Sequence, residues 1–120
     1  MSYMLLILEE GESRRSRPAE VGQAAYARML RFGEDLQARG LLKASDALRS
    51  DAEGARLTVR GGKRMVVDGP FTESKEIVGG FFLIDCKTKE EALAIAAECP
   101  AAEWSTVEVR EVGVCFQEDN

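Results

Sequence analysis

Two segments that are apolar at nearly every position constrain the fold of this 120-residue chain most strongly. Residues 3–8 and 77–84 lack the alternation of polar and apolar residues that marks a strand with one face in water. A strand with such a continuous pattern is covered on both faces. Both runs fall far short of the roughly 20 residues that a membrane-spanning helix needs. The chain is therefore predicted to hold two buried strands and no membrane segment.

The segments between these strands predict two helices. Residues 19–39 carry one apolar stripe at helical spacing, made of Val21, Ala25, Met29, Phe32 and Leu36. Gly40 follows as the predicted C-cap of this helix. Residues 88–91 read Thr-Lys-Glu-Glu, a capping box that opens a second helix, and Pro100 ends it. The buried stripe of the second helix is predicted to be Ala92, Ile95, Ala96 and Cys99.

Weaker patterns complete the element order. Residues 9–17 are predicted as a polar loop, residues 41–48 and 106–112 as strands, and residues 116–120 as a polar tail. Alternating residues on both sides of Gly61-Gly62 predict a hairpin. A three-residue loop that pairs Val59 with Met65 is preferred for this hairpin, because it gives one uniformly apolar face.

The resulting order, β-α-β-β-β-β-α-β, predicts a single α+β domain over residues 1–120 with a ferredoxin-like antiparallel sheet and two helices on one face. Two helices cover only one face of such a sheet, whereas the two central strands are apolar on both faces. A second copy of the same sheet is the simplest cover for the other face. We therefore expect a homodimer with sheet packed on sheet.

Charge and composition exclude several classes of function. The net charge is −5, and neither half of the chain has the basic field that nucleic-acid binding needs. The chain has no histidine, which removes Ser-His and Cys-His nucleophiles and histidine-ligated zinc. Three widely spaced cysteines, Cys86, Cys99 and Cys115, are typical of reduced thiols acting as small hydrophobic residues. With no basic region ahead of an apolar stretch at the N-terminus, no signal peptide is predicted, and a cytoplasmic protein is expected.

Residues 67–76 read Val-Asp-Gly-Pro-Phe-Thr-Glu-Ser-Lys-Glu, and Gly79-Gly80-Phe81 follows shortly after. The start of the chain, the segment around Gly61-Gly62-Lys63-Arg64 and the segment 107–110 extend the same pattern over nearly the whole chain. This pattern resembles the DGPF-type branch of the YCII-related family. The resemblance implies a dimeric α+β-barrel fold, and it implies no securely established molecular function.

The resemblance also carries expectations about the site. Other YCII-related branches have a His–Asp pair proposed as an active site, in a cleft like that of muconolactone-isomerase-like proteins. This chain keeps the aspartate as Asp68 but has no histidine to partner it. Where relatives often have Gly-Glu-Gly-Leu, this chain has Ser45-Asp46-Ala47-Leu48. DGPF-type relatives are often associated with extracytoplasmic-function sigma factors, which implies a regulatory setting.

Asp68 and the glycines after it each have two interpretations. Asp68 either accepts backbone hydrogen bonds that fix the turn, with Gly69 adopting unusual dihedrals, or holds a carboxylate at the mouth of a cleft as a base or ligand anchor. Gly79-Gly80 indicates either a bulge or the close approach of another group to the strand. Phe81 and Phe82 are expected to point to opposite faces, mainly for core packing.

Charged residues near the predicted cleft also leave alternatives open. Glu108 and Arg110 share the face opposite the helices, as an ion pair or as an anion site in which Glu108 orients Arg110. Lys75 and Glu76 are solvated loop charges, or they close over a pocket. Tyr26 departs from the apolar stripe of its helix and is within reach of a cleft.

The sequence therefore predicts a small dimeric binding or accessory protein whose cleft takes a small polar or anionic ligand. Its ligand-binding residues are predicted to be Asp68, Gly69, Pro70, Phe71, Lys75, Gly80, Glu108 and Arg110. The alternative is an isomerase- or lactone-type enzyme with Asp68 as general acid or base, and a third class is a protein-interaction module that contacts a sigma factor. No cofactor or metal site is predicted, since nucleotide, metal and phosphate-loop motifs are missing from the sequence.

Overall fold

The computed structural model describes residues 1–116. In chain order, its elements are β1 (Ser2–Glu9), α1 (Gly11–Ser16), α2 (Ala19–Ala38), β2 (Leu42–Ala47), η1 (Asp51–Glu53), β3 (Ala55–Arg60), β4 (Lys63–Asp68), β5 (Ile77–Asp85), α3 (Lys89–Ala97), η2 (Pro100–Glu103) and β6 (Thr106–Glu111), where η marks a short 3₁₀ helix. Strands β2, β5, β1 and β6 form one antiparallel sheet in that order, and β3 and β4 form a separate hairpin. This arrangement confirms the predicted ferredoxin-like α+β fold.

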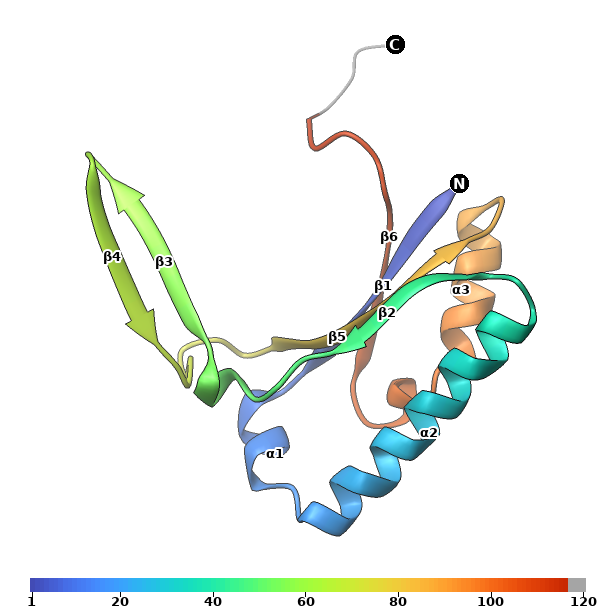
Figure 1. The fold of residues 1–120 in the computed structure, drawn as a ribbon, viewed down its shortest axis with the longest axis horizontal. Helices are drawn as coiled ribbons and strands as arrows, with labels where there is room; N and C mark the ends of the chain where they lie inside the picture. The colour runs from blue at the N-terminus through green and yellow to red at the C-terminus, as the bar shows by residue number, and fades with distance from the viewer. Residues whose placement is uncertain (117–120) are drawn as a thin grey trace.

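The long helices α2 and α3 lie on the same side of the four-stranded sheet (Figure 1). The side chains of β1 alternate strictly, with Tyr3, Leu5 and Ile7 buried toward the helices. Phe32 of α2 meets Phe82 of β5 edge to face, with ring centroids 5.0 Å apart. The rest of this core is buried or half-buried and comprises Leu36, Ile84, Cys86, Ala92, Ile95, Ala96, Cys99, Ala101, Val107 and Val109.

The other face of the sheet has no helix over it. The strand registers place Leu6 of β1 opposite Phe81 of β5 and opposite Glu108 of β6 on that face. We call this surface the open face, and its apolar members are Met4, Leu6, Leu8, Val78, Phe81 and Leu83. All six side chains are half-buried or exposed. Of the two apolar faces of the central strands, one therefore packs in the core under the helices and the other is uncovered.

The helix caps follow the sequence. Gly40 has a φ of +73°, the left-handed conformation expected just past a helix C-terminus, and the N–H of Leu41 donates to the carbonyl of Leu36. The Thr88 hydroxyl accepts a hydrogen bond from the N–H of Glu91. The Glu91 carboxylate reaches back to the N–H of Lys87, one residue before the cap.

The hairpin turn differs from the prediction. The register pairs Val59 with Arg64 and Arg60 with Lys63, so the turn has two residues and not three. Gly61 and Gly62 have φ values of +58° and +76°, which are the angles of a tight hairpin turn whose twist matches that of the strands. This local preference decides the register, because no core packs on the hairpin to reward a uniformly apolar face.

Three further expectations need comment. Residues 11–16 form the helix α1, where a loop was predicted. Cys115 is exposed, unlike the buried Cys86 and Cys99, and all three thiols are unpaired. The predicted polar tail lies outside the described residues apart from Phe116. Within residues 1–116, no helix is both long and apolar enough to cross a membrane.

Candidate functional site

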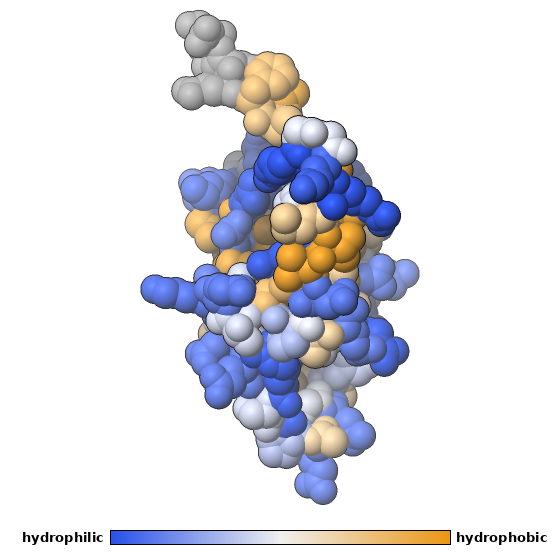
Figure 2. Space-filling view, turned by 90° about the vertical axis from the view of Figure 1, so that its left-hand side faces the viewer, coloured by the Kyte–Doolittle hydropathy of each residue, from blue (hydrophilic) through white to orange (hydrophobic). Residues whose placement is uncertain are grey.

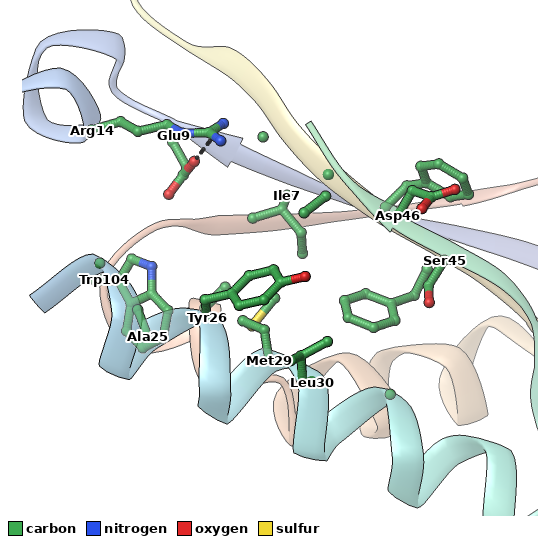
Figure 3. A pocket seen from close by; sticks show the side chains of 18 of the residues that line it. Ile7, Glu9, Arg14, Ala25, Tyr26, Met29, Leu30, Ser45, Asp46 and Trp104 are labelled. Carbon is green, nitrogen blue, oxygen red and sulfur yellow. Dashed lines mark ion pairs between the residues drawn. The ribbon is translucent and has the colours of Figure 1, made fainter. Parts of the chain in front are cut away.

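A cleft of about 510 Å³ lies between α2 and the helix-facing side of the sheet (Figure 3). Ile7 from the sheet and Met29 and Leu30 from α2 form apolar walls, and Tyr26 and Trp104 add aromatic surface. Clefts of roughly 300–1,000 Å³ with mostly apolar walls are typical of small-molecule sites. Tyr26 therefore lines a cleft on the helix side of the sheet, whereas the cleft predicted from the sequence lies between the sheets of two copies.

One end of the cleft carries a partly buried cluster of charges. Glu9, the last residue of β1, is only 8% exposed, and its carboxylate lies 3.3 Å from both Arg14 Nη1 and Arg17 Nη2. Helix α1 positions Arg14 at this end of the cleft, and Arg14 Nη2 also donates a hydrogen bond to the carbonyl of Leu48. Two guanidinium groups against one carboxylate leave this end with a net positive charge. Among the described residues, Arg14 Nη1 is buried and, beside this ion pair with Glu9, makes no hydrogen bond.

The opposite end of the cleft has a different character. Ser45 and Asp46 lie there, across the cleft from Arg14 (Figure 3). These residues belong to the segment 45–48, where the chain departs from the Gly-Glu-Gly-Leu of its relatives. The cleft is thus basic at one end, apolar along its length, and lined by the Ser45 hydroxyl at the other, because Asp46 pairs with Phe81 and therefore turns its carboxylate to the open face.

Two glycines of β5 make room for this arrangement. A Cβ atom on Gly79 would lie 2.3 Å from Glu9 Oε2, and one on Gly80 would lie 2.8 Å from the carbonyl oxygen of Asp46. The register of β1 with β5 shifts at this point, because Ile7 pairs with Gly80 and Leu8 pairs with Val78. The bulge predicted at Gly79-Gly80 is therefore present, and the groups that approach the strand closely are Glu9 and the neighbouring strand β2, while an approach by a ligand stays a prediction.

The Asp68-Gly69-Pro70-Phe71 motif lies elsewhere, at the base of the hairpin. We call this region the hairpin junction, and its centre is Asp51 of η1. The Asp51 carboxylate accepts a hydrogen bond of 3.0 Å from the N–H of Phe71 and two, of 2.7 and 2.8 Å, from Arg15 Nη1. Burial alone would raise the pKa of Asp51, but the hydrogen bonds from Phe71 and Arg15 outweigh it and hold this pKa below its usual value.

Gly69 and Phe71 fit tightly into the hairpin junction. A Cβ atom on Gly69 would lie 1.8 Å from the backbone oxygen of Asp51, so only glycine fits, while its N–H donates to the carbonyl of Gly54. Its φ is not in the left-handed region, so the expectation of unusual dihedrals is wrong and the requirement is one of space. The buried Phe71 ring stacks under the Arg56 guanidinium, 3.9 Å away.

Sequence similarity connects this chain to known proteins. A family model of the YCII-related domain matches residues 1–114. The chain belongs to the YCII-related family. An uncharacterized protein of Rhizobium meliloti (strain 1021) is 46% identical over 52 residues, which is 43% of this chain and 42% of that protein. The matched segment therefore spans less than half of the relative. Neither comparison carries a molecular function, as the sequence resemblance implied.

For this YCII-related chain, the structure separates the predicted site residues into four places: the cleft, the hairpin junction, the loop after the motif and the open face. Gly80 lines the cleft. Gly69 and Phe71 belong to the hairpin junction with Pro70, and Asp68, at the end of β4, is exposed and does not line the cleft. Lys75 lies exposed in the loop after the motif. The turn-fixing carboxylate is Asp51, since the side chain of Asp68 makes no hydrogen bond to the described residues.

Glu108 and Arg110 lie on the open face, as predicted, and form an ion pair of 3.7 Å at its β6 edge. They do not line the cleft, which is on the opposite side of the sheet. An anion-binding role for Arg110 and a base role for Asp68 both stay predictions.

Sequence reasoning missed the charged end of the cleft. Glu9, Arg14 and Arg17 were all placed in a polar loop, because a six-residue helix such as α1 is too short to show periodicity. The sequence signal for this end of the cleft was Gly79-Gly80, which indicates that some group approaches β5 closely but does not identify that group.

The hairpin junction makes a pH-dependent contribution to stability. Because the pKa of Asp51 is lower in the folded chain than in the unfolded chain, its contribution is complete above the ordinary aspartate pKa of about 3.9 and is lost as the pH falls through the lowered value. We expect Asp51→Asn to lower the free energy of unfolding at pH 6, by an amount that shrinks steadily below pH 4. Urea unfolding of both proteins from pH 2.5 to 7 measures this difference.

The matched control is Asp35→Asn, which alters an exposed pair between Asp35 and Arg39 within one stretch of α2. That variant should differ little from the parent at any pH, because exposed ion pairs contribute little. A constant gap between Asp51→Asn and the parent across the whole pH range would contradict the assignment of the lowered pKa.

Proposed function

We propose that this YCII-related chain binds a small amphipathic molecule in the cleft between α2 and the sheet, with an anionic group of that molecule at Arg14 and Arg17. The observation that carries the proposal is the pair of guanidinium groups, Arg14 and Arg17, that share the single carboxylate of Glu9 at the end of an apolar cleft. The positive charge left over there attracts a ligand anion, whose oxygen gains a charge-assisted hydrogen bond from a guanidinium group. The apolar walls supply the rest of the binding free energy.

The two ends of the cleft also fix the orientation of such a ligand. A carboxylate or sulfonate is attracted to the arginine end, whereas Ser45 at the other end offers a hydroxyl and no charge. The apolar part of the ligand then lies along Met29, Leu30 and Tyr26. A neutral ligand of the same shape keeps the apolar contacts and loses the ionic ones.

A matched pair of dyes tests the proposal. 8-Anilinonaphthalene-1-sulfonate and N-phenyl-1-naphthylamine share an aromatic body, and only the first is anionic. We expect the sulfonate to bind at least about tenfold more tightly, since one charge-assisted hydrogen bond is worth about 1.5–3 kcal/mol. Dye fluorescence, and the emission of Trp104, the single tryptophan of the chain and part of the cleft wall, report binding.

Three variants locate the binding. Arg17→Gln should remove most of the preference for the sulfonate, whereas Ala25→Phe should weaken both dyes, because Ala25 lines the cleft and phenylalanine would fill it. Arg49→Gln is the control, since Arg49 is an exposed arginine outside the cleft. Equal affinities of the two dyes for the parent, or unchanged binding to Ala25→Phe, would rule the proposal out.

We further propose that the chain forms a homodimer through the open face. Support comes from that face itself, which presents six apolar side chains of β1 and β5 with no helix over them. Contiguous apolar surfaces of this kind on small proteins mark interfaces. The DGPF-type branch, a cytoplasmic location and a link to sigma factors stay predictions of the sequence.

A further inference from the structure

Beyond the contacts of Arg56 at its base, the β3–β4 hairpin is exposed along its length. Of its twelve strand residues, all but Thr58 are exposed. An isolated two-stranded hairpin is marginally stable in water and needs a third strand or another surface to pack on. The radius of gyration, 16.3 Å, exceeds the roughly 13–14 Å of a compact chain of this length, in keeping with an arm that leaves the body.

The exposed residues of the hairpin include a run of large apolar side chains. Seen from the hairpin side, apolar surface gathers between hydrophilic side chains (Figure 2). The register places Leu57, Val59 and Val66 on one face of the ribbon, and Met65 and Val67 on the other. Each of these five side chains is about half exposed or more, from 49% to 58%. Five large apolar side chains on one solvated ribbon indicate a surface that another molecule covers.

Charge indicates which molecule covers it. Four basic residues and one acidic residue give the hairpin a net charge of +3, which leaves −8 for the rest of a chain whose total is −5. A basic arm on an acidic body is attracted to the body of a second copy. A nucleic acid would be attracted to the arm, but the remainder of the chain would repel it.

The position of the hairpin fits the same partner. It projects from one end of the sheet, on the side away from α2 and α3, which is the side of the open face (Figure 1). A second copy seated on the open face would lie beside the hairpin. We propose that the β3–β4 hairpin is an arm that docks on the second copy of the chain in the homodimer. This inference rests on the dimer proposed above and adds a second contact region to it.

Two substitutions test the arm, one on each face of the ribbon. Val66→Asp and Met65→Asp place the same charge on opposite faces of the ribbon. We expect the substitution on the docking face to weaken dimerisation at least tenfold in sedimentation equilibrium. Leu93→Asp is the control: Leu93 lies on α3, away from both proposed surfaces, and is 49% exposed, the same as Val66. It should leave the dimer dissociation constant unchanged.

Hydrogen exchange of the parent protein provides a second test, because a substitution can unfold the hairpin itself. In the parent, the hairpin amides should exchange at least tenfold more slowly at concentrations where the dimer forms than at dilution. A parent dimer with unprotected hairpin amides, or with neither substitution weakening it, overturns the arm and leaves the open-face dimer standing. A parent that is monomeric, or a hairpin whose amides are protected only by duplex DNA, overturns the arm as well.

Discussion

Gly69→Ala is expected to lower the free energy of unfolding by more than about 3 kcal/mol, because the added Cβ would make the shortest contact found at any glycine of this chain. The Cβ would lie 1.8 Å from the backbone oxygen of Asp51, a distance that no rotamer change relieves because the backbone fixes the positions of both atoms. The chain must instead pull η1 away from the Gly69-Pro70-Phe71 segment. Doing so breaks the hydrogen bond from Phe71 to Asp51.

Urea unfolding and hydrogen exchange measure this result together. If the hairpin junction opens locally, the amides of Gly69 and Phe71 lose protection even where the global free energy changes less. Gly113→Ala is the matched control, since a Cβ there meets no atom within 4 Å. A Gly69→Ala protein with parental stability and parental exchange at Phe71 would show that the hairpin junction is wrongly described.

Leu5→Ala and Leu6→Ala, at neighbouring positions of β1, are expected to affect different properties: the stability of the protomer and its association. Leu5 is fully buried under the helices, so its truncation should lower the free energy of unfolding of the protomer by about 3 kcal/mol. Leu6 lies half-buried on the open face, so its truncation should change the protomer by less than about 1 kcal/mol. Leu6→Ala should instead weaken association, because the open face forms the proposed dimer interface.

Unfolding at submicromolar concentration and sedimentation at higher concentration separate the two effects. The parent should sediment as a particle of twice the 13.2 kDa chain mass, and the Leu6 variant should dissociate at higher concentration than the parent. The two variants control each other, since each removes the same atoms from the same strand. If both destabilise the protomer equally and neither changes association, the division into a core face and an open face is wrong.

The sequence predicted the central strands β1 and β5 and both long helices well because those elements have strong local signals. The strict apolar runs of β1 and β5, the helical stripe of α2 and the Thr88 capping box each act over a few neighbouring residues. The hairpin turn was wrong by one residue. The prediction weighed face uniformity above turn geometry, and on a ribbon without a core the angles of Gly61 and Gly62 decide the register.

The candidate site was harder to predict than the fold. The most specific motif, Asp68 to Phe71, drew attention as a ligand site, and the structure places it in the hairpin junction around Asp51. The charged end of the cleft comes from Glu9 and Arg14, which carry no motif at all. A motif of glycine, proline and a buried aromatic residue signals a tight backbone arrangement, and such an arrangement serves packing as well as chemistry.

By itself, the sequence determined that β1 and β5 are apolar on both sides, that no histidine is present for catalysis, and which fold the element order forms. These properties depend on residue type and near-neighbour spacing, which a sequence displays directly. Only the tertiary structure decided that Glu9, Arg14 and Arg17 meet beside a cleft, and that Asp51 and not Asp68 fixes the turn. Those contacts depend on where α1 and η1 pack against the ends of β5 and β4, and long-range packing leaves no local pattern in the chain.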